Sequence, residues 1–474
     1  ISEWGKRDWI KQFSRGLLYS ITGLEVLALA HHISLLAGIK SPQLSSLASF
    51  ETYLWAFSWP LTLILIPASI IPFLMSVYFT AINRRNYKDE DKKSPRILVL
   101  LALVLSIAVS SIGYLPTVNP YMQPLNVDWV FYYSALQELD KSKNVLSTVF
   151  NPPSNVRSYF IRDVDRPLYL LLLYTLSKVF PSNEKALCIY HNIALMLLYT
   201  FSLYFMTTRV FGKKVALYTS LVAPITPHAL SFLYGGFQAN LFTLSLIQIA
   251  IGLVFDSNMR IYIRLPAIAS LSTIALMTHV YTWMQYLLAM SIAMIATITI
   301  AIYGKFKEIK IRVAQTLLGL VSFLAPGIVI EIILRIFSIS RRIDVAWLIM
   351  QIMPILRKGL DINGLWRSME FYINIYTGGS LNTPLYWLIF AIASFCTPVT
   401  VFGFSYVYLP LLASVALYAI NPLFAYRTTL NIPTATIIAY LISRFDNKTK
   451  TLIIVTLYSL AIGKILGFIP GLQL

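Results

Sequence analysis

The feature that most constrains this chain is a succession of long apolar runs separated by short polar or basic segments. A helix needs about 20 apolar residues to cross a membrane, and about thirteen runs follow one another. In chain order they are Gly16–Ile39, Leu54–Ile82, Ile97–Leu115, Ala186–Thr207, Val215–Leu233, Leu241–Phe255, Leu265–Met277, Met284–Tyr303, Val313–Leu334, Leu385–Phe395, Val399–Ile420, Leu430–Ser443 and Thr451–Ile469. This pattern predicts an all-α, polytopic membrane protein with about 13 transmembrane helices.

The composition supports this class, since 57% of the 474 residues are hydrophobic and only 12% are charged. The net charge of +18 could suggest nucleic acid, but the basic residues are scattered between apolar runs, where membrane topology explains them. We therefore expect no nucleic-acid partner. Cys188 and Cys396 both lie inside apolar runs and form neither a disulfide framework nor a metal-ligand spacing. The first apolar run lacks a small-residue cleavage site, so no signal peptide is expected.

One stretch, Pro116–Phe180, interrupts the pattern with polar, proline and aromatic residues. Loops this long are usually functional or disordered, and its apolar content is too high for a disordered linker. Apolar residues at helical spacing predict a helix over Trp129–Leu139. The apolar run Leu168–Phe180 is shorter than the ~20 residues that a crossing needs, so we expect it to lie in the interface. We interpret the stretch as an active-site loop folded on the outer surface.

Charge placement predicts the orientation. With the N-terminus in the cytoplasm and Leu168–Phe180 not crossing, the cytoplasmic loops carry 22 Lys or Arg and the outside carries 15. Thirteen of those 15 lie in the long loops 116–185 and 335–382, where the positive-inside rule is weak. The chain is therefore predicted to be a multi-pass protein of the cell membrane, with both long loops and the turn 234–240 extracytoplasmic.

Two residues of the first long loop are candidates for chemistry. Asp128 lies just outside an apolar run, where a carboxylate at the mouth of a membrane cavity could act as a general base, or it could simply cap the helix that follows. Arg166 precedes Pro167 at a helix start, where a guanidinium suits a lipid phosphate. The alternative for Arg166 is an interfacial side chain paired with a neighbouring aspartate.

Three later residues carry weaker indications. Arg427 is a candidate phosphate ligand or a headgroup anchor at the outer leaflet. His228 and His279 fall at predicted outer helix ends and are more typical of structural histidines than of catalysts. There is no phosphate-cradling glycine loop, HExxH or CxxC pair, and no soluble nucleotide-sugar domain. An activated donor should therefore come from within the membrane.

The order of these features resembles the GT-C superfamily of glycosyltransferases, especially its protein O-mannosyltransferase and lipid A aminoarabinose transferase branch. The matching stretches are Val127–Tyr133, Asp165–Leu170, Arg209–Lys214 and Tyr426–Pro433. Their arrangement is similar to that family's outer loop that opens with an acid, its basic–Pro–Leu helix entry, its basic cytoplasmic turn and its late Arg-containing element. The resemblance covers roughly residues 97–445 and concerns order and spacing more than identity.

The resemblance implies a donor sugar on a polyprenyl or dolichyl phosphate and inverting transfer to a hydroxyl of a protein or lipid acceptor. Asp128 would match the catalytic base, and Arg166 and Arg427 would match the groups that bind the donor phosphate. No obligatory metal or other cofactor is implied. Further candidates for the cavity lining are Asp165, His228, Gln238, Asn240 and His279.

The chain also departs from the family. The turn 234–240 offers Gln238 and Asn240 where relatives often have a second acid, and Arg166-Pro167 lacks a second proline. The missing acid and the missing Trp-Trp-Asp-Tyr-Gly element argue against an oligosaccharyltransferase.

We expect a membrane extension and basic loop over residues 1–96, a GT-C-like module over 97–445 and a last transmembrane helix within 446–474. The alternatives are a non-catalytic GT-C-like scaffold that binds a membrane or surface protein and, less favoured, a transporter. The latter is less favoured because the sequence has no inverted repeat.

Overall fold

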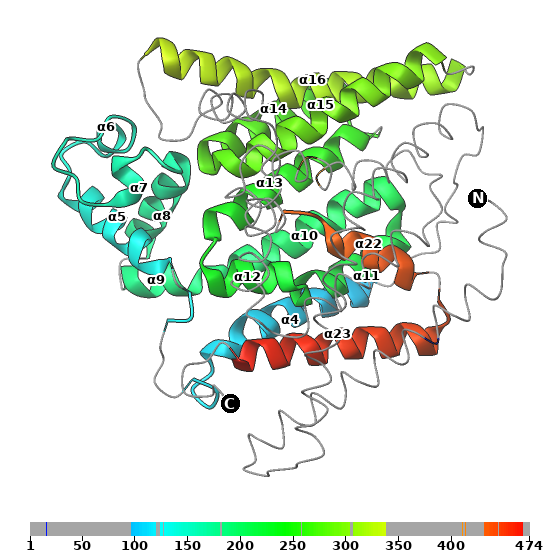
Figure 1. Cartoon of the computed structure of the whole chain (residues 1–474), viewed down its shortest axis with the longest axis horizontal. Helices are drawn as coiled ribbons and strands as arrows, with labels where there is room; N and C mark the ends of the chain where they lie inside the picture. Colours follow the sequence, from blue (N-terminus) through cyan, green and yellow to red (C-terminus); the bar gives the residue numbers. More distant parts are fainter. Residues whose placement is uncertain are drawn as a thin grey trace, which may run out of the picture.

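The computed structural model describes the central part of the chain and a shorter C-terminal part (Figure 1). The described residues are 16, 96–119, 124–126, 128–180, 183–256, 258–303, 307–337, 410, 413, 431–443 and 445–467. Every regular element among them is a helix, as the sequence predicts. The elements are α4 Arg96–Ser111, η2 Ile112–Tyr114, α5 Trp129–Lys141, α6 Val145–Phe150, α7 Tyr159–Arg162, α8 Pro167–Val179, α9 Glu184–Tyr190, α10 Asn192–Phe211, α11 Lys213–Val222, η3 Ala223–Ile225, α12 Pro227–Gly235, α13 Gln238–Phe255, α14 Ile261–Thr278, α15 Val280–Tyr303, α16 Lys307–Ile336, α22 Thr434–Ile442 and α23 Asn447–Gly467.

Six helical stretches in the described part are long and apolar enough to cross a membrane. They are Ile97–Tyr114, Glu184–Phe211, Gln238–Phe255, Ile261–Thr278, Val280–Tyr303 and Val313–Ile336. The pair α11–η3 and α12 makes a seventh if the bent pair is one span. The chain is therefore an all-helical membrane protein.

Helix α13 is the centre of the bundle. Of its residues, 83% are buried, against 28% for the span Ile97–Tyr114. It packs mainly against α10 and α14, and α16 lies over α14 and α15 (Figure 1). The outer helices keep large apolar side chains exposed, for example Leu100 on α4 and Ile302 on α15. Such exposed apolar faces are expected of helices that face lipid.

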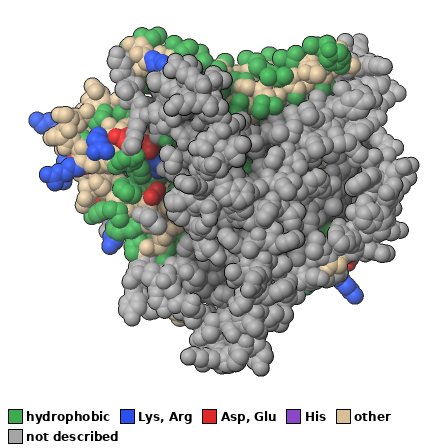
Figure 2. All heavy atoms as spheres, in the orientation of Figure 1, with side chains coloured by type: hydrophobic (Ala, Val, Ile, Leu, Met, Phe, Trp, Pro, Cys, Tyr) green, Lys and Arg blue, Asp and Glu red, His purple; other side chains and the backbone are tan. Residues whose placement is uncertain are grey.

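The first long loop folds into a compact group of short helices, α5 to α9, at one end of the bundle (Figure 1). The predicted helix Trp129–Leu139 is confirmed as α5, and the short apolar run is α8. Helix α8 has 13 residues, or about 20 Å, which is too short to cross the hydrocarbon core. Its interfacial position remains a prediction. Figure 2 shows basic side chains around the edge of this group, with acidic ones among apolar side chains.

Two sequence-based boundaries were wrong. The run Val215–Leu233 is broken, because Pro224 and Pro227 lack the N–H that would continue a helix. Conversely, the polar break between the predicted runs Leu265–Met277 and Met284–Tyr303 shrinks to one residue, His279, since α14 ends at Thr278 and α15 begins at Val280.

The crossings predicted in the C-terminal part of the chain agree with the structure only in part. Helix α22 has nine residues, too few to cross a membrane by itself, whereas we predicted a crossing over Leu430–Ser443. Helix α23, which overlaps the predicted last crossing Thr451–Ile469, is not among the six candidate spans. Most of four predicted crossings, of the long loop 335–382 and of the extension 1–96 lies outside the described residues, as does Arg427. The count of 13 crossings is therefore still a prediction.

The close approach of α10 and α13 generates a stability prediction. A Cβ on Gly252 would lie 2.7 Å from the Phe205 ring and 3.2 Å from the Met206 Cα atom. Small residues at such crossings let helix backbones approach closely. Gly252→Leu should therefore destabilise the bundle by about 2 kcal/mol through overpacking, measured as a lower thermal transition in detergent. Ala314→Leu adds the same side chain at an exposed position of α16 and should leave the transition unchanged.

Candidate functional site

Asp128 occupies the N-cap position of α5 but does not cap it with its side chain. Its backbone has helical rather than extended dihedrals, with φ −82° and ψ −2°, so the carboxylate is not aimed at the first-turn N–H groups. Its backbone N–H instead donates to Asn126 Oδ1 at 3.1 Å. The structure thus gives Asp128 the position of a cap without the cap hydrogen bond, which weakens the simpler of the two interpretations.

The turn between α12 and α13 packs against Asp128. Gly236 has φ +82°, and a Cβ there would lie 2.5 Å from the Asp128 backbone nitrogen. Only a residue without a side chain fits this close approach in that conformation. The predicted acid of the first loop and the predicted glycine-bearing turn are therefore brought together.

Gln238 and Asn126 tie the same region to the end of α9. Gln238 Nε2 donates to the Cys188 carbonyl oxygen at 2.8 Å, and Asn126 Nδ2 donates to that oxygen at 3.3 Å. All three residues are buried. The amide of Gln238 therefore has a structural partner in the position where the resemblance suggested an acid.

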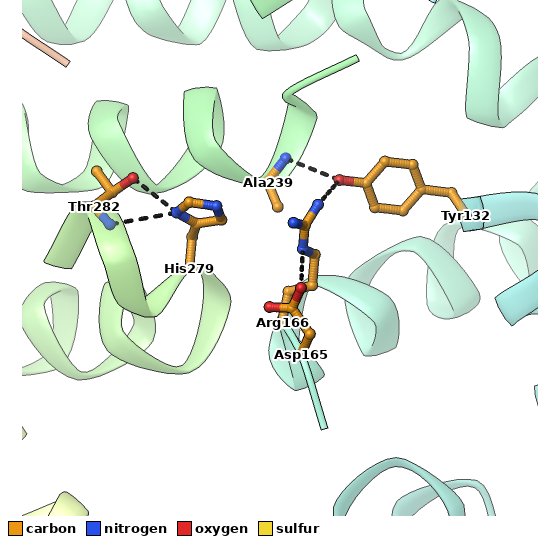
Figure 3. Close-up of polar contacts among 6 residues, drawn as sticks. All are labelled: Tyr132, Asp165, Arg166, Ala239, His279 and Thr282. Carbon is orange, nitrogen blue, oxygen red and sulfur yellow. Dashed lines mark hydrogen bonds and ion pairs between the residues drawn. The ribbon is translucent and has the colours of Figure 1, made fainter. Parts of the chain in front are cut away.

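Arg166 is the most heavily engaged charge of the site (Figure 3). Its Nε donates to Asp165 Oδ2 at 3.2 Å and its Nη1 donates to Tyr132 Oη at 2.8 Å. The guanidinium also lies over the Phe160 ring, 4.2 Å from the centroid. Arg166 is only 7% exposed, which a charge tolerates when it is paired and hydrogen-bonded.

The backbone that presents Arg166 is strained. Val164 and Arg166 have φ 47° and 53°, which side chains other than glycine rarely adopt. Val164 N–H donates to Ile161 O, and Asp165 N–H donates to Phe160 O. This is the hydrogen-bond pattern of a Schellman helix ending, with a valine where glycine is usual. Strain of this kind persists only where surrounding contacts hold it, and it is frequent at functional sites.

Burial and neighbouring charges shift the pKa values of Tyr132 and Arg166. Burial raises the pKa of Tyr132 to about 12, with Asp128 adding to the rise and Arg166 opposing it. Burial alone would lower the pKa of Arg166, but Asp165, Tyr132 and Asp128 together raise it above its usual value. The tyrosine is therefore a neutral phenol and the arginine a permanent cation at neutral pH. Asp128 interacts electrostatically with both groups.

Asn240 and His279 belong to an adjacent buried network. Thr282 Oγ1 donates to Asn240 Oδ1 and shares a hydrogen bond of 2.8 Å with His279 Nδ1. Asn431, which precedes α22, donates from Nδ2 to Thr282 Oγ1 at 3.4 Å and to Gln285 Oε1 at 2.7 Å. The network joins α13, α15 and the start of α22 beside the N-terminal end of α13.

The remaining predicted residues lie elsewhere. His228 is at the bend between η3 and α12, where its Nδ1 shares a hydrogen bond of 3.3 Å with Thr434 Oγ1. It is thus joined to α22 rather than to the Asp128–Arg166 group. Arg427 falls outside the described residues, so its approach to Arg166 remains a prediction. No group of three or more potential metal ligands occurs among His, Cys, Asp and Glu of the described part.

Sequence reasoning missed Tyr132, Asn126 and Thr282 as site residues. Tyr132 lies four residues after Asp128 on a predicted helix, so its side chain falls on the same face. That spacing could have identified it. The hydrogen bonds of Asn126 and Thr282 join elements far apart in the chain, and spacing within the sequence does not indicate them.

These features define an all-helical membrane protein with a buried Arg166–Tyr132 pair, joined to the partly exposed Asp165, at one end of its bundle. No family model, curated protein or solved structure matches the chain. The functional class therefore has to be inferred from the geometry.

A matched pair of arginines tests how much the structure depends on the buried one. Arg166 and Arg162 each pair with an adjacent aspartate at 3.2 and 3.3 Å, but their side chains are 6% and 57% exposed. Lysine keeps the charge and loses the planar fork and the ring stacking. Arg166→Lys should lower stability by about 2–4 kcal/mol, whereas Arg162→Lys should cost about 1 kcal/mol or less. Thermal transitions of the two purified variants would measure the difference, and equal losses would contradict the central role of Arg166.

Proposed function

We propose that the chain is a GT-C-like glycosyltransferase that moves a sugar from a polyprenyl or dolichyl phosphate to an acceptor hydroxyl on the extracytoplasmic face. The observation that carries the proposal is the convergence of Asp128, Arg166 and the α12–α13 turn on one group at the end of the bundle. A carboxylate beside a fixed guanidinium is what transfer from a phosphate-linked donor requires. The carboxylate deprotonates the acceptor, and the guanidinium stabilises the departing phosphate.

Arg166 retains a group for this role. Its Nη2 makes no hydrogen bond within the described part of the chain. Nη2 is also not among the fully buried side-chain atoms of that part that lack a hydrogen-bond partner. The neighbouring Asp165 side chain is 17% exposed, so this cluster reaches the surface. The donor phosphate would approach Nη2, with Arg427 as a second phosphate ligand. Membrane lipids surround the bundle, and the acceptor is a protein or lipid hydroxyl.

The role of Asp128 yields a direct prediction. Asp128→Asn removes the base while keeping the size of the side chain, so transfer from a labelled polyprenyl-phosphate hexose should fall by at least about 100-fold. Asp163→Asn, a nearby acid paired with Arg162, should retain transfer and serves as the matched control. Both variants should show unchanged thermal transitions. Full transfer by Asp128→Asn would end the assignment of the base.

The proposed orientation can be tested independently. The α5–α9 group and the turn at Gly212 lie at opposite ends of α10, whose 20 residues are about 30 Å long. We expect Lys143→Cys, between α5 and α6, to react with an impermeant maleimide added outside intact cells. Lys214→Cys, exposed at the start of α11, should react only after the membrane is permeabilised. The reverse result would invert the proposed topology.

One observation favours a second candidate function, a non-catalytic membrane scaffold. Gln238 and Asn240, in the turn where GT-C glycosyltransferases often carry a second acid, form hydrogen bonds with the Cys188 carbonyl and with Thr282. Arg166 likewise has structural partners on three sides. The scaffold predicts a stoichiometric protein partner that co-purifies with the chain. The enzyme instead predicts a co-purifying polyprenyl phosphate.

A further inference from the structure

The Tyr132 hydroxyl has a proton that nothing in the described part of the chain accepts. Its oxygen accepts one hydrogen bond from Arg166 Nη1 at 2.8 Å and another from the Ala239 backbone N–H at 3.4 Å. A phenol has one donor hydrogen in addition to these acceptor sites. Tyr132 is 0% exposed, so water at the molecular surface does not accept the hydrogen either. A buried donor without an acceptor is costly and calls for a partner.

The surroundings of this hydroxyl favour an anion as that partner. Arg166 directly precedes α8, and Ala239 is the second residue of α13. The positive ends of two helix dipoles therefore meet at the Arg166–Tyr132 contact. Asp165 and Asp128 oppose this potential, but Asp165 is bonded to the Nε of Arg166 and leaves Nη2 available. Arg166 Nη2 and the hydroxyl proton are two donors on one fixed pair of side chains.

We infer that Tyr132 is a specificity-determining residue that donates its hydroxyl proton to an anionic phosphate oxygen held by Arg166. The inference rests on the proposed function, in which that phosphate belongs to a lipid-linked donor. Tyr132 can present the proton accurately because its ring is fixed between Phe160 and Tyr169, with centroids 5.0 and 5.5 Å away. Phosphate is preferred to a neutral polar ligand because both donors and both helix ends favour negative charge.

Binding experiments with a substituted tyrosine separate this role from a purely structural one. Tyr132→Phe is insufficient alone, because it also deprives Arg166 Nη1 and the Ala239 N–H of their acceptor and could unfold the site. 3-Fluorotyrosine at position 132 keeps the hydroxyl. Fluorine withdraws electron density, which makes the O–H a stronger donor and the oxygen a weaker acceptor. Since burial raises the pKa of Tyr132 to about 12, the fluorinated phenol stays protonated at neutral pH.

The ligands are farnesyl phosphate, as a short lipid phosphate, and inorganic phosphate, both measured by calorimetry on the full-length chain in detergent. If Tyr132 donates to the phosphate, fluorination should tighten farnesyl phosphate binding about twofold or more, and Tyr132→Phe should weaken it at least about tenfold. 3-Fluorotyrosine at Tyr133, the next residue of α5, should change neither value. Inorganic phosphate responding as strongly as farnesyl phosphate would assign the site to free phosphate rather than to a lipid headgroup, overturning the lipid part of the inference.

Two results would overturn the inference in distinguishable ways. Unchanged or weaker binding of farnesyl phosphate by the fluorinated chain would leave Tyr132 as an acceptor that only positions Arg166. The proposed function would survive that result. No binding of farnesyl phosphate by the unsubstituted chain would remove both the inference and the proposed lipid-phosphate donor.

Discussion

The organisation of this site depends on one buried cation, Arg166. A guanidinium that is almost sealed from water has to be paired, and its partners come from three separate elements. Asp165 precedes α8, Phe160 belongs to α7, and Tyr132 lies on α5 and reaches α13 through Ala239. The contacts of this one charge therefore join α5, α7 and the start of α8 to one another and, through Tyr132, to α13. The positive φ values at Val164 and Arg166 are consistent with this, because strained backbone needs contacts to hold it.

Helix α13 connects the Arg166 group to the membrane-spanning part. Its first turn forms hydrogen bonds with Tyr132, Cys188 and Thr282, and the helix as a whole is the most buried of the six candidate spans. At the opposite end, Arg209 pairs with Asp256 at 3.0 Å and Arg264 donates to the Asp256 carbonyl at 2.6 Å. Polar contacts thus hold both ends of the apolar helix α13, and they fix its position along the bundle. In lipid such contacts matter because unsatisfied polar groups are costly there.

Much of the fold could be predicted from the sequence. Apolar length alone indicated most of the spans, and helical spacing indicated α5. The differences have local causes: Pro224 and Pro227 divide the predicted run Val215–Leu233 into a bent pair of helices, and the polar residues on either side of His279 belong to α14 and α15. These polar residues can lie within or between buried helices because Thr282 donates to Asn240 on α13 and shares a hydrogen bond with His279. Hydropathy treats each polar residue as isolated and so predicts a longer break than the single residue, His279, that separates α14 from α15.

The sequence by itself determined the class of protein, a helical membrane chain. Apolar side chains must be kept from water and backbone polar groups must be hydrogen-bonded in lipid, and a helix meets both requirements within a single segment of the chain. It also marked Asp128 and Arg166, since a charge beside an apolar run is conspicuous without any neighbour. Only the tertiary structure decided what these groups touch. Tyr132 became the link between Arg166 and α13, Gln238 became a tie to Cys188, and His228 turned toward α22. The physical reason is that hydrogen bonds act over about 3 Å in space, and their partners here are separated by tens to hundreds of residues along the chain.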